Sequence, residues 1–493
     1  MATVHLVDHP TALAADVLVV GTLAAERGAV LAPGAEQVDA ALDGALAGAL
    51  TALEATGRVD EVLRIPTLGR AGVPLVIATG LGHGSPEALD AEAIRRGVGA
   101  ALRSVDRARR VAVAIGTGTD PALAAAASDG ALLGSYRFTR FKSGANGSAL
   151  RRVEVAVSEP ANSAARAALR RSVVIAAAVN NARDLVNTPA NLLNPVTLAE
   201  YAREQAEAAG MRVEVLDEKA LRRGGYGGIS GVGGGSATPP RLVRLSYSPA
   251  RPRASVALVG KGITFDTGGL DLKREAMADM KSDMGGAAAV IEAAIAAAKL
   301  KLPVAVTATV PMAENAVSGT SYRPSDVLTM RNGSTVEVAN TDAEGRLILA
   351  DAISRACEDA PDYLIETSTL TGGQVVALGE HTAGVMGSER FRDWIVPVAA
   401  AAGESVWPMP LGSHLRPQLD SPVADIANVT GLRWASMLMG GTFLADFVTD
   451  GVEWVHLDIA GPAYLNKPTG YQPSGGTGYI VRTIIAALSE LGA

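Results

Sequence analysis

Charged side chains suited to metal binding gather in three short segments in the second half of the 493-residue chain. Seven charged side chains of these segments are the candidates, namely Lys261, Asp266, Lys273, Asp283, Asp342, Glu344 and Arg346. Four converging carboxylates would repel one another and raise one another's pKa values. Two divalent cations would balance that charge, so these residue types predict a two-metal site of the kind found in hydrolases. All six histidines lie outside the segments, so the ligands would be mainly carboxylates.

The elements expected around these segments would bring them together. Apolar strands precede the first and third segments, and helix-like runs follow Asp283 and Glu344. We expect Asn340 and Thr341 to cap the second of these helices. In a parallel α/β sheet the carboxyl ends of neighbouring strands line one crevice, where ligands bind. Each acid alone has an ordinary explanation as a helix-terminal or solvated charge, but three such segments in one domain favour the metal site.

The rest of the chain predicts a mainly parallel α/β organisation. Apolar runs that end in glycine, such as DVLVVGTLA and PLVIATGLG, alternate with helical patterns, one of them over residues 85–105. We expect an N-terminal α/β domain over residues 1–162, a connecting helix over residues 163–187 and a catalytic domain over residues 188–493. The glycine-rich stretch 224–240 is interpreted as a flexible loop, because two prolines stand where the helix of a dinucleotide-binding loop would begin.

Composition narrows the class of protein. A net charge of -7 argues against general affinity for nucleic acid or for anionic membranes. Clustered arginines such as Arg109 and Arg110 are interpreted as solvated surface charge. The single cysteine, Cys357, is expected to be a buried structural thiol. MATVHLVDHP has neither the basic nor the apolar part of a secretory signal, and no apolar run reaches transmembrane length, so we expect a cytoplasmic protein without membrane partners.

The same segments carry a family resemblance. VGKGITFDTGG, MKSDMGGAAAV and above all NTDAEGRLILADA resemble the leucyl aminopeptidase (cytosol aminopeptidase) family of two-metal exopeptidases. NLLNP, TSTLTGG, VWPMPL and LDIAGPA are similar to further landmarks of that family, from about residue 181 to the C-terminus. The resemblance implies an N-terminal α/β domain and a larger α/β/α catalytic domain around a central mixed, mainly parallel sheet. It also implies a homohexamer that removes leucine and other apolar residues from peptides with a free N-terminus.

The resemblance also assigns metal ligands. It implies that Asp266 and Glu344 bridge two ions, that Asp342 completes one of them, and that Lys261 and Asp283 complete the other. Manganese, zinc and magnesium all suit such oxygen-rich ligands. A lysine ligand must be deprotonated, which direct contact with a dication favours. The ions would share and activate a water molecule, and the substrate's free α-amine would bind one of them.

Further residues receive roles from the resemblance. Protonated Lys273 would stabilise the oxyanion that forms at the scissile carbonyl. Arg346 would hold a bicarbonate ion as the general base, since a guanidinium offers paired donors to a planar anion. Main-chain groups around Leu370 and Gly372 would orient the substrate. Met280 would line the pocket for the first side chain, with ordinary core packing as the alternative.

The chain departs from the family pattern at three places. The stretch from Lys273 to Asp283 is one residue shorter than expected, Asp271 adds an acid near the catalytic lysine, and Glu366 stands where an aspartate is expected. Three other functions remain open from the residues alone. They are a carboxylate-rich phosphoesterase, a DNA-binding regulator of the same family, and a catalytically inactive scaffold, which the full set of charged residues disfavours.

Overall fold

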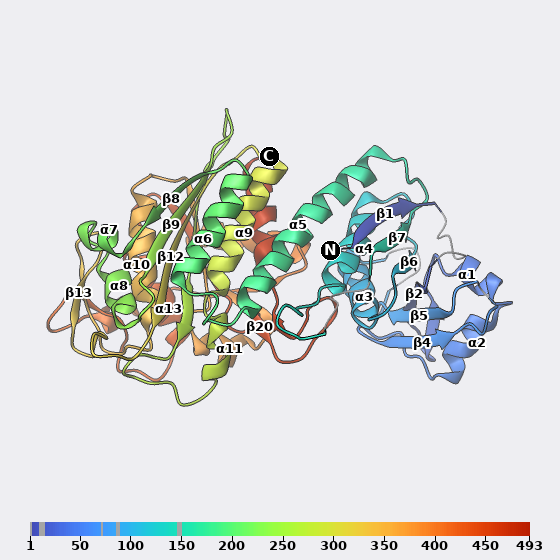
Figure 1. Ribbon diagram of the computed structural model, residues 1–493, viewed down its shortest axis with the longest axis horizontal. Coiled ribbons are helices and arrows are strands. Elements are labelled where there is room, and N and C mark those ends of the chain that lie inside the picture. The colour runs from blue at the N-terminus through green and yellow to red at the C-terminus, as the bar shows by residue number, and fades with distance from the viewer. Residues whose placement is uncertain (1, 9–14, 71, 85–88, 145–149) are drawn as a thin grey trace. The chain divides into compact units, whose positions relative to one another are not determined.

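The computed structural model describes residues 2–8, 15–70, 72–84, 89–144 and 150–493, and the chain forms two compact units (Figure 1). The first unit comprises residues 1–180 together with 466–474, and the second comprises residues 181–465 together with 475–493. Helix α5 spans Ser163–Asn187, the range that the periodicity predicts. The start of the helix predicted over residues 85–105 lies outside the described residues, and α3 covers Ala91–Arg103.

The first unit is built on a mainly parallel sheet. Its strands run in the order β1-β7-β6-β2-β5-β4, with β3 beside β2, and only β3 and β4 are antiparallel to their neighbours. The bounds are β1 Thr3–Val7, β2 Val17–Ala24, β3 Ala29–Leu31, β4 Val62–Pro66, β5 Leu75–Gly80, β6 Arg110–Ala114 and β7 Arg152–Ala156. The helices of this unit besides α3 are α1 Glu36–Ala41, α2 Ala45–Ala52 and α4 Pro121–Gly134.

The second unit is built on a larger mixed sheet. Its strands run in the order β17-β16-β19-β15-β10-β12-β9-β8, with β11 beside the end of β12. The central strands β19, β15, β10 and β12 are parallel to one another. The bounds are β8 Arg212–Leu216, β9 Arg241–Tyr247, β10 Ser255–Gly260, β11 Gly262–Asp266, β12 Ala305–Asn315, β15 Tyr363–Ser368, β16 Thr382–Gly387, β17 Ser405–Pro408 and β19 Glu453–Asp458.

Helices cover both faces of this sheet (Figure 1). Along β10, Ala257 and Val259 join the hydrophobic core formed with α10 (Glu344–Cys357), while Gly260 lies against α9 (Gly285–Leu300) on the opposite face. Such burial of both faces is typical of a central parallel strand. The predicted α/β/α arrangement is confirmed, and the other helices are α6 Pro195–Ala208, α7 Glu218–Arg223, α8 Gly227–Val232, α11 Gly372–Leu378, α12 Glu389–Ala401, α13 Ser436–Ala445 and α14 Val481–Leu491.

Two local predictions are wrong. The strand-like run before Asp342 becomes β14 (Thr335–Glu337), which belongs to a separate small sheet with β13 (Val327–Thr329) and β18 (Ile426–Ala427). The glycine-rich stretch 224–240 is no loop throughout, because it contains α8 and a short 3-10 helix. Tertiary packing overrides the low helix propensity of glycine there: a Cβ on Gly228 would lie 2.2 Å from the carbonyl oxygen of Leu347 in α10, so only glycine permits this approach.

Candidate active site

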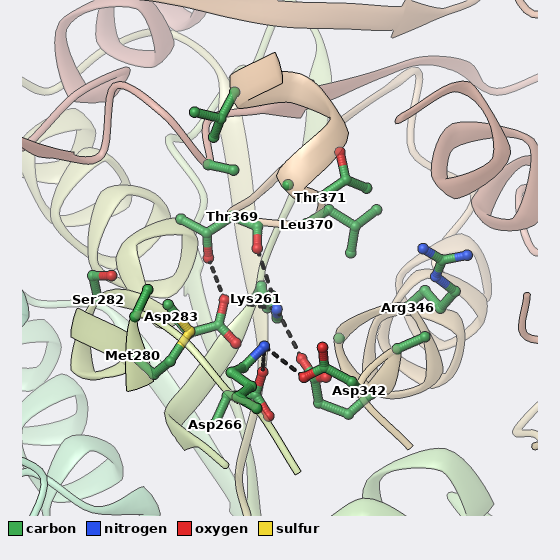
Figure 2. A pocket seen from close by; sticks show the side chains of 18 of the residues that line it. Lys261, Asp266, Met280, Ser282, Asp283, Asp342, Arg346, Thr369, Leu370 and Thr371 are labelled. Carbon is green, nitrogen blue, oxygen red and sulfur yellow. Dashed lines mark hydrogen bonds and ion pairs between the residues drawn. The ribbon is translucent and has the colours of Figure 1, made fainter. Parts of the chain in front are cut away.

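One cavity of about 480 Å³ in the second unit is lined by every candidate site residue of the sequence. Figure 2 shows this cavity from close by. The ten residues are Lys261, Asp266, Lys273, Met280, Asp283, Asp342, Glu344, Arg346, Leu370 and Gly372. They come from segments more than a hundred residues apart in the chain. The structure therefore brings together all ten candidate residues from the charged segments and TSTLTGG.

The central sheet positions two members of the charged cluster. Lys261 directly follows β10, and Asp266 is the last residue of β11, which pairs with the end of β12. Asp283 reaches the cavity by a different route, since it lies between a 3-10 helix (Met277–Ser282) and α9. Glu344 is the first residue of α10. Carboxyl ends of strands and amino ends of helices thus meet at one edge of the sheet, as expected for α/β sites.

Lys261 lies between two acids at the floor of the cavity. Its Nζ is 2.7 Å from Asp283 Oδ1 and 2.9 Å from Glu344 Oε1, and it donates to the main-chain oxygen of Thr369 at 3.2 Å. The Thr369 hydroxyl donates to the same Asp283 oxygen at 2.7 Å. Lys261, Asp283 and Glu344 are all buried.

Lys273 makes a second bridge between acids. Its Nζ lies 2.7 Å from Asp266 Oδ2 and 2.5 Å from Asp342 Oδ1. The other Asp266 oxygen accepts from the main-chain N–H of Gly268 and from the side-chain amide of Asn315, each at 2.8 Å. Lys261 points into the acidic cluster (Figure 2), and each of the two lysines contacts a different pair of carboxylates.

The electrostatics of the cluster follow from burial and proximity. Burial and the nearby charge of Glu344 raise the pKa of Asp266 to about 6, and burial also raises the pKa of Asp283. Burial by itself would lower the pKa of Lys261, but the charges of Asp283, Glu344 and Asp266 outweigh it and raise that pKa. The pKa of Glu344 is lowered because the two lysines outweigh its burial. The cluster thus attracts positive charge strongly.

The residues fit a divalent metal ion. One oxygen each of Asp266, Asp342 and Glu344 lie within 4.8 Å of one another, close enough to bind the same ion. Asp283 Oδ2 and Glu344 Oε2 are buried and have no hydrogen-bond partner among the described residues. Buried carboxylate oxygens without a partner are costly, and carboxylates are the ligands that hard divalent cations prefer. A cation beside the Lys261 amine would also lower its pKa and free its lone pair.

Arg346 is buried in the first turn of α10 and lines the same cavity. Its Nη1 donates to the main-chain oxygen of Asn428 at 2.7 Å, whereas its Nε has no hydrogen-bond partner among the described residues. Burial lowers its pKa to about 10, so the guanidinium stays charged at neutral pH. A buried cation with an uncommitted donor is chemically suited to a small planar anion.

A further wall of the cavity is formed by the segment between the end of β15 and the start of α11. Thr369, Leu370, Thr371 and Gly372 lie there in sequence. Met280, half-buried on the 3-10 helix, lines the cavity from the other side and is not among the buried core residues. The wall therefore combines apolar side chains with main-chain groups beside the charged cluster.

Details at the cluster differ from the sequence predictions. Neither Asn340 nor Thr341 caps α10. The Asn340 side chain instead accepts from the main-chain N–H of Asp342, which precedes the helix, and the Thr341 hydroxyl donates to the main-chain oxygen of Gly268. Asp271 accepts from the main-chain N–H of Thr341 at 2.7 Å, so it braces the loop that carries Asp342.

Glu366, the other acidic departure from the family pattern, lies in the core of the sheet. It pairs with His456 on the neighbouring strand β19 and is fully buried.

Four residues that contact this site escaped the sequence analysis. Asn315 donates to Asp266, Thr369 donates to Asp283, Asn428 accepts from Arg346, and Asp458 accepts from Leu370 and Thr371. Two of them stand inside quoted landmarks, Thr369 in TSTLTGG and Asp458 in LDIAGPA. Asn315 and Asn428 stand in no charged motif, and only the tertiary structure identifies them.

Fold and cavity together define an α/β/α protein with a carboxylate-rich candidate metal site. Residues 180–485 match the sequence model of a family catalytic domain, that of the cytosol aminopeptidase family, and residues 17–145 match the model of the same family's N-terminal domain. The chain belongs to the cytosol aminopeptidase family.

Relatives match over nearly the whole chain. A probable cytosol aminopeptidase of Rhodococcus jostii (strain RHA1) is 52% identical over 97% of this chain and 95% of its own. Among solved structures, a tomato leucine aminopeptidase mutant superposes with a TM-score of 0.88 at 30% identity, covering 99% of this chain and 97% of its own. The bottromycin maturation enzyme BotP in complex with Mn superposes with a TM-score of 0.84 at 36% identity, covering 97% of this chain and 100% of its own. None of these relatives supports the DNA-binding interpretation.

Proposed function

We propose that the chain is a metal-dependent aminopeptidase that releases leucine and other apolar residues from the N-terminus of peptides. The observation that carries the proposal is the convergence of all ten candidate residues on one cavity. The family membership supports the aminopeptidase activity. Leu370 and Met280, which line the cavity from different sides, support the preference for an apolar first residue.

We assign the metal ligands to the acidic cluster and Lys261. Asp266, Asp342 and Glu344 would share one ion, and Lys261 and Asp283, with the bridging acids, would hold a second. The complex of BotP with Mn supports manganese as one suitable ion, and zinc suits the same ligands. Divalent cations held there would supply a Lewis acid and lower the pKa of water.

The other charged side chains supply binding and proton transfer. Lys273 contacts Asp266 and Asp342 in the acidic cluster, and its ammonium would stabilise negative charge on a scissile carbonyl oxygen. All four carboxylates of the charged cluster are assigned to metal, and Arg346 would hold a bicarbonate ion as the proton acceptor through its uncommitted donor. Leu370 and Gly372 would orient the peptide along the wall that they help to form.

The proposal is tested by the need for a free amine. Release of leucine from a Leu-peptide and from its N-acetyl form would be measured in bicarbonate buffer with added manganese or zinc. We expect cleavage of the free-amine peptide alone, and none after treatment with a chelator. Cleavage of both peptides would contradict recognition of the amine, and cleavage that survives the chelator would contradict a role for metal.

Assembly and location remain proposals. We propose a homohexamer in the cytoplasm, on the strength of the family membership and the names of its relatives. Within the described residues no helix combines the length and apolar character needed to cross a membrane. Light scattering of the purified protein would test the hexamer directly, and a stable monomeric mass would contradict it.

A further inference from the structure

A fully buried acid outside the metal cluster holds the apolar wall of the cavity. Asp458 is the last residue of β19, and its side chain is 0% exposed. Its carboxylate accepts from the main-chain N–H of Leu370 at 3.1 Å, from the Thr371 hydroxyl at 2.7 Å and from the main-chain N–H of Ala460 at 3.2 Å. All three of these donors belong to residues that line the cavity.

The wall is thereby held from two sides. On the side of the charged cluster, Lys261 donates to the oxygen of Thr369, and the Thr369 hydroxyl donates to Asp283. On the other side of the wall, the Asp458 carboxylate accepts hydrogen bonds from Leu370 and Thr371, the next two residues of the same segment. Asp458 therefore fixes where the wall stands relative to the charged cluster, although it is not among the candidate metal ligands.

The surrounding packing leaves the segment after Asp458 little freedom. Ser368 and Asp458 are paired across β15 and β19, and the fully buried Gln374 accepts from the main-chain N–H of Gly461 at 2.6 Å. A Cβ at Gly461 would lie 2.3 Å from the main-chain oxygen of Gly379. The geometry of the wall thus depends on a rigid frame, within which the Asp458 carboxylate makes the contacts to Leu370 and Thr371.

We infer that Asp458 is a positioning residue that sets the fit of the cavity wall to the first side chain of the peptide. The inference rests on the proposed aminopeptidase function. Removing the carboxylate would leave two partly buried N–H groups and one buried hydroxyl without their acceptor, and a buried donor without a partner is costly. The wall would relax, and a large first side chain such as leucine would lose more contacts than alanine.

Asp458→Ala and Asp458→Asn separate positioning from simple loss of stability. Hydrolysis of leucine and alanine p-nitroanilides would be measured with both variants and the wild type. We expect Asp458→Ala to lower kcat/KM for the leucine substrate by about tenfold or more, chiefly through KM, and to reduce the preference for leucine over alanine. Asparagine keeps the oxygen that accepts from Leu370 and Ala460, so Asp458→Asn should recover most of that preference.

A matched control is Glu404→Ala. Glu404 is also a buried acid, and it accepts from the main-chain N–H groups of Ile480 and Thr483 and from the Thr483 hydroxyl. It does not line the cavity. Its removal costs the same kinds of hydrogen bond, so we expect lower thermal stability with KM and the leucine preference unchanged. Calorimetric titration with Mn²⁺ should give wild-type affinity for Asp458→Ala.

Distinct outcomes separate the inference from the proposed function. If Asp458→Ala lowers turnover of both substrates by one factor with KM unchanged, the carboxylate only maintains the fold and the inference is overturned. Loss of Mn²⁺ affinity in that variant would overturn it as well. A wild-type protein that cleaves neither substrate would refute the aminopeptidase function, and the inference with it.

Discussion

Replacing Gly345 by alanine is expected to remove metal binding and activity while the fold persists. Gly345 stands between Glu344 and Arg346 in the first turn of α10. A Cβ at this position would lie 2.2 Å from Cε, 2.7 Å from Nζ and 2.9 Å from Cδ of Lys261. Carbon atoms in contact stay about 3.5–4.0 Å apart, so the lysine side chain would have to move by more than an ångström. The glycine of NTDAEGRL therefore provides the space that Lys261 occupies.

The magnitude follows from how tightly Lys261 is held. The side chain is buried and its Nζ pairs with Asp283 and Glu344, so a flexible chain end cannot simply swing into solvent. Overpacking of this kind costs about 1–3 kcal/mol, and the higher helix propensity of alanine returns about 1 kcal/mol. We expect a net loss of roughly 0–2 kcal/mol in the free energy of unfolding. Displacing a ligand should cost far more in function, at least about 100-fold in metal affinity.

Three measurements on Gly345→Ala test this reasoning: calorimetric titration with Mn²⁺, hydrolysis of leucine p-nitroanilide, and thermal unfolding. Gly48→Ala is the matched control, because a Cβ in that helix would meet nothing within 4 Å. The control should be slightly more stable than the wild type and equally active. A Gly345→Ala protein that binds Mn²⁺ and hydrolyses the substrate as the wild type does would refute the reasoning.

Further predictions address single groups of the site and the core. Asp266→Asn should lower Mn²⁺ affinity at least about 100-fold, whereas Glu275→Gln, which also removes a carboxylate from the cavity lining, should leave it unchanged in the same titration. Arg346→Ala should keep Mn²⁺ affinity but lower kcat about 100-fold. Omitting bicarbonate from the assay should slow the wild type and not the variant. Equal slowing of both proteins would contradict the assignment of bicarbonate to Arg346. Burial raises the pKa of Glu292 from 4.5 to about 6, so the folded state binds a proton more tightly than the unfolded state, and stability falls as pH rises through that interval. Denaturant unfolding should show Glu292→Gln gaining roughly 2 kcal/mol relative to the wild type between pH 4 and pH 7, and a constant difference would contradict the shift.

Local patterns predicted much of the fold. Runs such as ASVALVGKG and PDYLIETS are strands in the structure, β10 and β15, because continuous apolar stretches bounded by turns suit a sheet buried on both faces. Cys357 is buried, as expected. The glycine-rich stretch was misread because its helix is stabilised by close packing on α10, which no local pattern reveals.

Residue types and motif spacing by themselves determined which charged side chains could form the site, and the family resemblance added Met280, Leu370 and Gly372. Charge balance pointed to metal, and all ten named residues line one cavity. How they meet was decided only by the tertiary structure. Asp342 follows a strand of a separate small sheet, and Asp283 follows a 3-10 helix. The prediction that neighbouring strands of one sheet carry the charged residues at their carboxyl ends therefore holds for only part of the cluster. Only the tertiary structure identifies three further residues of the site, Asn315, Asn428 and Asp458. Their hydrogen bonds join segments that are far apart in the chain, and such bonds depend on packing, which produces no periodic pattern in the sequence.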